Sequence, residues 1–461
     1  MTAAVILAAG DGKRMKSNNS KVCCEVLSKP MLSWVLDSCS DAGIATQNTC
    51  VVIADDPKGV DKLLPEGIAT AVQKERKGTG HAVSCAMDFL QGLRDNYVEH
   101  VAVLCGDAPF IDSVTLSESY NYHTSHKNDV TVLTAKVDDP ARYGRIIRDK
   151  NGDFAKIVEA ADATSQQLLI NEINSGAYWF SVSYLISNLP LLEPKNVQGE
   201  YYLTDMVELA FKTGGRAGAF VCADPSVALG ANDRAALAQL NRVARDAVLL
   251  RHYKNGVDIP ITDGVIIGPD VLIGRDTTIL PGTILIGKTT IGEGCTIGPN
   301  TRIISTTVGN GCTIDSSRLE QSKVGSGVRI GPFAQLRPNS VIADNVKIGN
   351  FVEIKNSTVG EKTSFAHLTY IGDSDFGARI NVGCGVVTVN YDGVSKHRTT
   401  VGDDAFIGCN SNLIAPVTVE QGGYVAAATT VTKTVPADAM AIGRVKQENK
   451  PGLALRWRKK K

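Results

Sequence analysis

The sequence lacks the features that mark several large classes of protein. Lysine plus arginine and aspartate plus glutamate each number 48, so the formal net charge is zero. Proteins built to hold a nucleic-acid backbone are usually basic, so we expect neither DNA nor RNA as the main partner. The longest apolar stretches, such as residues 5–9, fall far short of the roughly 18 residues that a membrane-spanning helix needs. We therefore expect no stable membrane insertion.

The cysteines lack the spacing of a disulfide framework or a zinc site. There are 11 of them, an odd number, and no two are spaced CxxC. The first residues lack the basic segment that opens a signal peptide. These absences predict a cytoplasmic protein with reduced thiols.

Glycine divides the chain into two unlike halves. Residues 1–255 hold 17 of the 44 glycines, and residues 256–461 hold 27. In the first half, apolar runs at 3–7, 49–54 and 100–104 alternate with helical patterns at 31–42 and 80–93. This alternation predicts an α/β domain with a largely parallel sheet.

A helical pattern follows this domain. Asn232 can cap a helix over 232–253, in which Leu237, Leu240 and Ala244 have helical spacing. We predict an α/β domain at 1–231, a linker helix at 232–254 and a third region at 255–461. A final helix packed on the first domain explains the pattern equally well.

A six-residue repeat dominates the second half. Ile267-Gly268 recurs as Ile273-Gly274, Ile291-Gly292 as Ile297-Gly298, and Val401-Gly402 as Ile407-Gly408. One aliphatic residue in every six is typical of a parallel β-helix, in which three hexads close one triangular coil. We expect the aliphatic residue to point inward and the small residue beside it to let the chain turn tightly. A glycine-rich β-sandwich explains the composition but not the period.

The first apolar run leads into a loop of small residues, Ala8-Ala9-Gly10-Asp11-Gly12-Lys13-Arg14-Met15. Its backbone N–H groups can cradle phosphates, although it is neither GxGxxG nor a P-loop. Together with Lys21, the loop resembles the signature of sugar-nucleotide pyrophosphorylases. The resemblance implies that residues 7–10 (Leu7, Ala8, Ala9 and Gly10) hold the uracil and ribose, while Arg14 and Lys21 meet the triphosphate. Many relatives have proline where this chain has Ser20.

Further strings in this half match the same family. Gln73 can bind a pyrimidine edge, Gly78 and Thr79 allow close approach to the base, and His81 is more plausibly structural than catalytic. Asp107 ends a predicted parallel strand, where a carboxylate suits Mg²⁺. The resemblance adds Asn232 as the second Mg²⁺ ligand. It also implies nucleotide or sugar contacts from Cys105, Gly106, Gly144, Glu159 and Asn174.

Chemically active residues interrupt the repeat between 333 and 391. His367 lies close in sequence to Glu353, Lys355 and Tyr370, and two coils of about 18 residues would bring such groups to one face. Histidine is the usual base near neutral pH for an amine that attacks a thioester. Arg337 and Lys355 suit a sugar phosphate.

Nearly the whole chain resembles the bacterial family of bifunctional N-acetylglucosamine-1-phosphate uridylyltransferases and glucosamine-1-phosphate acetyltransferases. This resemblance implies a Rossmann-like nucleotidyltransferase domain, a connecting helix and a left-handed parallel β-helix that assembles as a homotrimer. It also implies Mg²⁺ as cofactor, with UTP, acetyl-CoA and glucosamine-1-phosphate as substrates, and a product used to build the cell wall. His367 becomes the general base and Glu353 its partner. The resemblance also implies two sets of binding residues. The sugar phosphate is bound by Arg337, Lys355, Tyr370 and Asn381, and acetyl-CoA is bound by Cys384, Asn390, Tyr391, Cys409, Ala427 and Arg444.

Two alternatives and two local questions stay open. The chain could be a single-function nucleotidyltransferase with a non-catalytic β-helix, or a scaffold without activity. Relatives commonly have Ala and Ser where this chain has Cys384 and Cys409, but neither thiol has an evident base beside it, so we expect direct acetyl transfer. The basic tail from Lys450 to Lys461 is either solvated or in contact with CoA phosphates.

Overall fold

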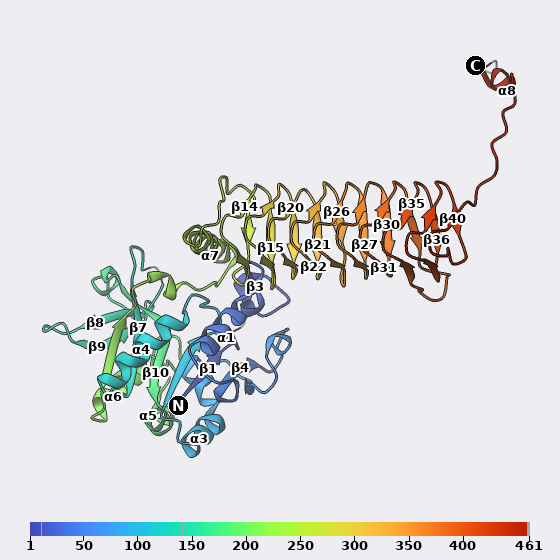
Figure 1. Ribbon diagram of the computed structural model, residues 1–461. Helices are drawn as coiled ribbons and strands as arrows, with labels where there is room; N and C mark the ends of the chain where they lie inside the picture. The colour runs from blue at the N-terminus through green and yellow to red at the C-terminus, as the bar shows by residue number, and fades with distance from the viewer. Residues whose placement is uncertain (11, 141, 459–461) are drawn as a thin grey trace. The chain divides into compact units, whose positions relative to one another are not determined.

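The computed structural model describes residues 1–10, 12–140 and 142–458 (Figure 1). The chain divides into two compact units, Met1–Ala244 and Arg245–Lys461. Asp11 of the small-residue loop and Lys459, Lys460 and Lys461 of the basic tail lie outside the described residues.

A twisted, mainly parallel sheet forms the centre of the first unit. Its strands run in the order β11-β7-β10-β6-β1-β4-β5, and only β10 is antiparallel to its neighbours along this path. β8 and β9 form a hairpin beside β10. The bounds are β1 Thr2–Leu7, β4 Thr49–Ala54, β5 Ala69–Gln73, β6 His100–Cys105, β7 Val130–Lys136, β8 Arg145–Arg148, β9 Phe154–Val158, β10 Glu172–Ser181 and β11 Ala217–Val221.

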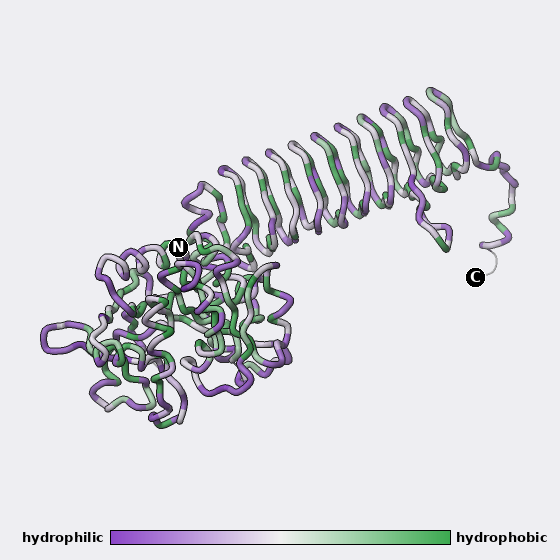
Figure 2. The backbone as a smooth tube through the Cα atoms, turned by 90° about the horizontal axis from the view of Figure 1, so that it is seen from below, coloured by the Kyte–Doolittle hydropathy of each residue, from purple (hydrophilic) through white to green (hydrophobic). Residues whose placement is uncertain are grey.

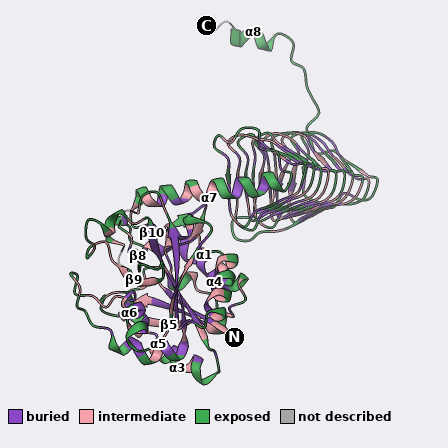
Figure 3. Cartoon of the chain, turned by 90° about the vertical axis from the view of Figure 1, so that its left-hand side faces the viewer, coloured by how far each residue is buried: buried purple, intermediate pink, exposed green. Residues whose placement is uncertain are grey.

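Helices cover both faces of this sheet, because strands buried on both sides need an apolar partner on each. α1 and α4 pack on one face through Leu32, Val35 and Leu116. α2, α3, α5 and α6 pack on the other. Figure 3 shows buried strands between helices whose outer sides are exposed. The bounds are α1 Met31–Asp41, α2 Thr79–Ser84, α3 Met87–Asp95, α4 Ser113–Ser125, α5 Val182–Asn188 and α6 Asp205–Lys212.

The single helix predicted over 80–93 is wrong, since α2 ends at Ser84 and α3 begins at Met87. The Ser84 hydroxyl donates to the carbonyl of Gly80 at 3.0 Å. The backbone N–H of Ala86 then bonds three residues back, to Val83 at 2.9 Å, which closes the turn between the two helices.

The predicted linker region contains one long helix, α7 (Arg234–Lys254). Its cap differs from the prediction: Asp233, not Asn232, accepts from the N–H of Ala236 at 2.9 Å. An aspartate at the residue before the first turn serves as well as an asparagine, so Asn232 keeps its side chain for other contacts. The boundary between the two compact units falls inside this helix.

The second unit is a parallel β-helix of short strands, from β12 (Ile266–Ile267) through β13 (Leu272–Ile273) and β14 (Thr278–Ile279) to β40 (Met440–Ala441). Each strand pairs in parallel with the strand one coil later; Ile266 faces Ile284, 18 positions along. In the described part of this unit the strands fall into three sheets, one for each side of the coil. Figure 2 shows the regular stack of coils.

The aliphatic residue of each hexad points inward as predicted, with Leu285, Ile303 and Leu319 fully buried in one column. The role expected for the small residue is wrong. Gly274 has no positive φ, but a Cβ there would lie 2.7 Å from the backbone of the next coil. The turn falls instead at residues such as Asp276, with φ of 58°. Glycine is therefore required for close stacking of coils rather than for the turn.

The chain described after the last coil includes a short helix, α8 (Leu453–Arg458), whose side chains are exposed. Within the described residues, no helix combines the length and the apolar character needed to cross a membrane.

Candidate active sites

The small-residue loop of the first unit begins at the carboxyl edge of the sheet. Leu7 ends β1 and stands in register with Cys105, which ends the neighbouring strand β6. The N–H of Gly106 donates to the carbonyl of Leu7 at 3.0 Å, and a Cβ on Gly106 would lie 3.1 Å from that oxygen. The loop and the Cys105-Gly106-Asp107 segment are therefore held side by side, where parallel sheets bind ligands.

Lys21, Asp107 and Asn232 meet at this edge. Lys21 begins a short 3-10 helix (Lys21–Cys23), and its ammonium pairs with the Asp107 carboxylate and donates to Oδ1 of Asn232 at 3.2 Å. The side chains of Lys21 and Asp107 are only 17% and 15% exposed. Two oxygen ligands thus converge on one cationic atom, as a carboxylate and an amide do around Mg²⁺.

Arg14 does not join this cluster. It lies exposed in the 3-10 helix Lys13–Met15, and within the described residues it forms no hydrogen bond or ion pair. Cys105 is half-buried, and burial raises the pKa of its thiol to about 12, so the thiol stays protonated. It donates to the carbonyl of Gly176 at 3.4 Å, a bond that joins β6 to β10.

The residues predicted to bind the nucleobase lie at the end of β5 and the start of α2. Gln73 ends β5, is 5% exposed, and donates to the carbonyl of Gly78 at 3.2 Å. Its amide also contacts Nδ1 of His81 at 3.1 Å, which gives His81 a structural role. Gly78 has φ of 105°, and a Cβ there would lie 2.5 Å from the carbonyl oxygen of Tyr201. Only glycine fits where these two segments cross.

The residues predicted for the sugar surround the start of β10. The carbonyl of Gly144 accepts from the N–H of Asn174 at 2.9 Å, and the Asn174 side chain donates to the hydroxyl of Tyr178 at 2.7 Å. The β10–β7 register shifts between Asn174 and Tyr178, a bulge of the kind that turns side chains toward a site. Burial raises the pKa of Glu159, which is hydrogen-bonded to Thr204.

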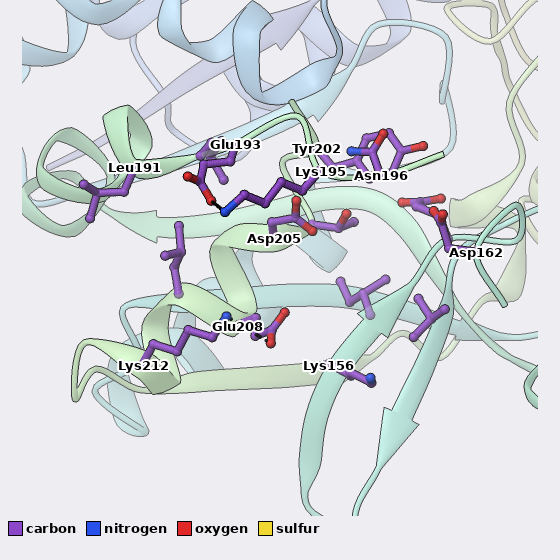
Figure 4. A pocket seen from close by; sticks show the side chains of 16 residues that line it. Lys156, Asp162, Leu191, Glu193, Lys195, Asn196, Tyr202, Asp205, Glu208 and Lys212 are labelled. Carbon is purple, nitrogen blue, oxygen red and sulfur yellow. Dashed lines mark ion pairs between the residues drawn. The ribbon is translucent and has the colours of Figure 1, made fainter. Parts of the chain in front are cut away.

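Two neighbouring cavities, of about 520 and 480 Å³, share Glu159 and Tyr202 in their walls. Ligand pockets commonly have such volumes. The first is lined in part by Thr79. Figure 4 shows the second, in which Lys195 pairs with Glu193 and Asp205 stands beside Tyr202. Burial raises the pKa of Asp205 to about 6.

In the second unit, His367 lies on one corner of the β-helix. Its Nδ1 is hydrogen-bonded to the side-chain oxygen of Asn350, one coil earlier. Backbone bonds link successive residues of this corner: Leu368 N to Asn350 O, Gly385 N to His367 O, Asn410 N to Cys384 O, and Ala428 N to Cys409 O. Asn350, His367, Cys384, Cys409 and Ala427 therefore form a column, which we call the His367 column.

Arg444 stands at the end of the His367 column and donates to the carbonyl of Ala427 at 2.8 Å. Cys409 is exposed and Cys384 is half-buried. A Cβ on Gly383 would lie 2.8 Å from Sγ of Cys409, so the coil in front of that thiol has no room for a larger residue.

A cationic cluster occupies the adjacent sheet face. Arg337 donates to Glu353 at 2.9 Å, and Glu353 stands in register with Tyr370 of the next coil, in β27 (Val352–Lys355) and β30 (Thr369–Gly372). A hydrogen bond with Lys396 lowers the pKa of Lys355. Glu353 thus contacts Arg337, whereas the partner of His367 is Asn350. Asn381 lies on a different sheet, in β32 (Asn381–Val382).

Asn390 begins a loop that leaves the coil. Its amide and that of Asn356 both donate to the carboxylate of Asp373, which is 5% exposed. Tyr391 follows, exposed, with its hydroxyl donating to the carbonyl of Gly393 at 2.6 Å. This arrangement fixes the base of the loop and leaves the Tyr391 ring at the surface.

Sequence reasoning gave no role to Asn350, Lys396 or Asp373. Asn350 stands directly before the Phe351-Val352-Glu353 string, and Lys396 lies within the loop that Asn390 opens. Their spacing to His367 and Lys355 carries no signal until the coils are stacked. For the residues described, no group of three or more His, Cys, Asp and Glu side chains could hold a metal ion.

Family models of known proteins match both halves of the chain. Residues 3–225 match the nucleotidyl transferase family, residues 270–305 and 321–356 match the bacterial transferase hexapeptide (six repeats), and residues 398–433 match the hexapeptide repeat of succinyl-transferase. Together with the stacked parallel strands, the hexapeptide matches identify the second unit as a left-handed parallel β-helix.

Full-length relatives carry both halves in the same order. The chain is 48% identical over 450 residues to the bifunctional protein GlmU of Caldanaerobacter subterraneus, covering 97% of this chain and 96% of the relative. It is 46% identical over 458 residues to that of Geobacillus thermodenitrificans (99% and 98%) and 45% over 453 residues to that of Acetivibrio thermocellus (98% and 97%). The chain therefore belongs to the GlmU family of bifunctional uridylyltransferases and acetyltransferases.

Proposed function

We propose that each of the two units of this bifunctional enzyme catalyses one step in the synthesis of UDP-N-acetylglucosamine. The β-helix transfers acetyl from acetyl-CoA to the amine of glucosamine-1-phosphate, and the first unit then transfers uridylyl from UTP to N-acetylglucosamine-1-phosphate. The observation that carries the division is near-full-length identity to the bifunctional relatives, with each site contained within its own unit.

In the uridylyl step, a phosphate oxygen of the sugar attacks the α-phosphorus of UTP. The bond to the β-phosphate breaks, and pyrophosphate leaves with its electron pair. Lys21 and Arg14 neutralise the triphosphate, since fixed cations are what phosphoryl transfer needs. Gln73, Gly78 and Thr79 hold the base, and Glu159 and Asn174 hold sugar hydroxyls.

The oxygens of Asp107 and Asn232 fit Mg²⁺, because both already converge on the ammonium of Lys21. When bound there, the ion neutralises charge that develops on the phosphates. Lys21 holds the two side chains in this geometry.

In the acetyl step, His367 accepts a proton from the substrate amine, whose nitrogen attacks the thioester carbon as CoA leaves as the thiolate. The Asn350 oxygen can only accept a hydrogen bond, so Nδ1 of His367 carries the hydrogen. Nε2 therefore keeps the lone pair with which His367 accepts the proton of the amine. Arg337, oriented by Glu353, joins Lys355, Tyr370 and Asn381 around the sugar phosphate. Transfer is direct, and neither Cys384 nor Cys409 carries the acetyl group.

The His367 column suits an extended cofactor. From His367 to Ala427 is three coil steps, or roughly 14 Å at 4.8 Å per step, a length suited to the pantetheine arm of acetyl-CoA. Asn390, Tyr391 and Arg444 complete this groove. Transfer to the amine then takes place at its His367 end.

A homotrimer would complete each acetyltransferase site. Phe351 and Leu368 directly follow Asn350 and His367, and they are 52% and 60% exposed. Phe351 stacks on exposed Phe333 at 5.5 Å between ring centres. Such an apolar edge beside a site supports packing of a second chain.

The cysteines support the cytoplasm as the compartment in which the protein works, because all of them are free thiols.

A split assay on the full chain tests the proposal. One reaction holds glucosamine-1-phosphate and acetyl-CoA and follows free CoA thiol; the other holds N-acetylglucosamine-1-phosphate, UTP and Mg²⁺ and follows pyrophosphate. Both products are expected, from a species with the mass of a trimer by light scattering. Pyrophosphate alone would mean that the β-helix is not catalytic, and CoA alone that the first unit has lost its activity.

A further inference from the structure

The 520 Å³ cavity of the first unit holds a residue that neither reaction has yet used. Its wall comes from segments far apart in the chain: the start of α2, the loop before β8, the end of β9 and the loop before α6. The residues that line it are Thr79, Arg142, Glu159, Ala160, Ala161, Gln198, Glu200 and Tyr202. Because Thr79 and Glu159 belong to the proposed base and sugar subsites, the cavity is part of the uridylyltransferase site.

Arg142 is the cation among these residues, and two carboxylates, Glu159 and Glu200, share the wall with it. Within the described chain, the Arg142 guanidinium forms no ion pair or hydrogen bond, and the residue is exposed. A sugar 1-phosphate carries close to two negative charges at neutral pH. Two carboxylates repel such a ligand, so the guanidinium is the group in this wall that can attract it.

The neighbouring cavity shows the contrast. There, Lys195 is paired with Glu193, and Lys212 lies 3.2 Å from Glu208. Figure 4 shows Lys195 turned toward Glu193. Those two ammonium groups are paired with neighbouring carboxylates, whereas Arg142, like Lys156 of the neighbouring cavity, has no ion pair within the described residues.

The loop that carries Arg142 is attached at two places, near the predicted magnesium ligand and near the sugar subsite. The next residue, Tyr143, is hydrogen-bonded through its phenol oxygen to the backbone of Gly230, which lies against Asp107. Gly144 is bonded to Asn174 on the sugar side. The loop therefore connects the predicted magnesium ligand with the sugar subsite, and Arg142 extends from it into the wall of the cavity.

We propose that Arg142 is a further substrate-binding residue of the uridylyl step, and that its guanidinium binds the phosphate of the incoming N-acetylglucosamine-1-phosphate. Guanidinium matches phosphate oxygens in a two-pronged geometry that an ammonium lacks. Its position among carboxylates makes it the attractive element of the cavity. This inference rests on the proposed function of the first unit.

Steady-state kinetics on the full chain tests the proposal, with Arg142→Gln, Arg142→Lys and the control Arg94→Gln, an exposed arginine of α3. Arg142→Gln should raise the KM for N-acetylglucosamine-1-phosphate about tenfold, the usual effect of losing one charge-assisted bond. The kcat and the KM for UTP should stay within about twofold, and Arg142→Lys should recover part of the loss. The control should match the unchanged protein.

Salt dependence separates charge from structure. For the unchanged chain, kcat/KM for the sugar phosphate should fall as ionic strength rises, and Arg142→Gln should flatten this slope. Acetyl transfer by the same samples reports that each variant is folded. An unchanged KM for the sugar phosphate, or a raised KM for UTP instead, overturns the role of Arg142 while leaving the proposed function intact. Lack of pyrophosphate release by the unchanged chain overturns the proposed function itself.

Discussion

The ammonium of Lys21 is paired with the carboxylate of Asp107, although 86 positions separate them in the chain. They meet because β1 and β6 are neighbours and end at the same edge of the sheet. Asn232 reaches the same ammonium from the loop before α7. This contact brings together the residues that the family resemblance assigns to the triphosphate and to Mg²⁺.

Asp107→Ala should abolish uridylyl transfer and leave acetyl transfer unchanged. Removal of the carboxylate takes away a Mg²⁺ ligand and releases Lys21 from its position, which should reduce kcat at least about 100-fold. The split assay measures both activities in one preparation. Asp112→Ala, which removes the cap of α4 instead, is the control. Loss of both activities in folded Asp107→Ala would contradict the two-site mechanism.

His367→Ala should lower acetyl transfer by about 10² to 10⁴, the usual contribution of a general base, with uridylyl transfer intact. Asn350→Ala should lower it less, by about tenfold, because the base remains but its ring loses the bond that orients it. CoA release measured against pH checks this order. If Asn350→Ala leaves both the rate and the pH profile of the enzyme unchanged, then Asn350 does not position His367.

Gly78→Ala should damage the uridylyl site. The residue has φ of 105°, and an added Cβ would meet the carbonyl oxygen of Tyr201 at 2.5 Å. We expect a loss of about 2 kcal/mol in unfolding free energy of the first unit and a higher KM for UTP. Gly92→Ala, where a Cβ meets nothing within 4 Å, is the matched control. Equal UTP affinity in both variants would argue against a base site at Gly78.

His252 should make the stability of the second unit depend on pH. The residue is 2% exposed, and neither ring nitrogen has a hydrogen-bond partner in the part of the chain that the structure describes. Burial lowers its pKa from 6.5 to about 4. Between these values the unfolded chain binds a proton that the folded chain does not, so stability is complete above pH 6.5 and falls as the pH drops toward 4. The loss should reach about 2–3 kcal/mol.

Urea unfolding of the full chain and of His252→Gln, compared at pH 7.5 and 5, isolates this effect. The variant has no group to titrate at that position, so its free energy of unfolding should fall less between the two pH values. Other titrating residues, such as Asp205, contribute equally to both proteins and cancel in the difference. The same pH dependence in both proteins would show that His252 is not the cause.

Periodicity and strand-end motifs were enough to predict much of this protein. The buried runs that became β1, β4 and β6, and the six-residue repeat that became the β-helix, are local patterns that mark which side of a strand is buried. The same patterns misplaced the cap of α7, because the choice between Asn232 and Asp233 depends on one side-chain hydrogen bond. They also joined α2 to α3, between which the N–H of Ala86 bonds to the carbonyl of Val83.

The sequence by itself determined the two folds and their order, and its family motifs predicted the residues of both sites. Only the tertiary structure decided which of those residues meet. Sheet order places Lys21 against Asp107, and coil stacking gives His367 the partner Asn350 and gives Glu353 the partner Arg337. Four separate segments, one of which carries Arg142, form the wall of the cavity in the first unit. Spacing along a chain specifies the local elements, whereas contacts between distant elements arise from how their apolar faces pack together.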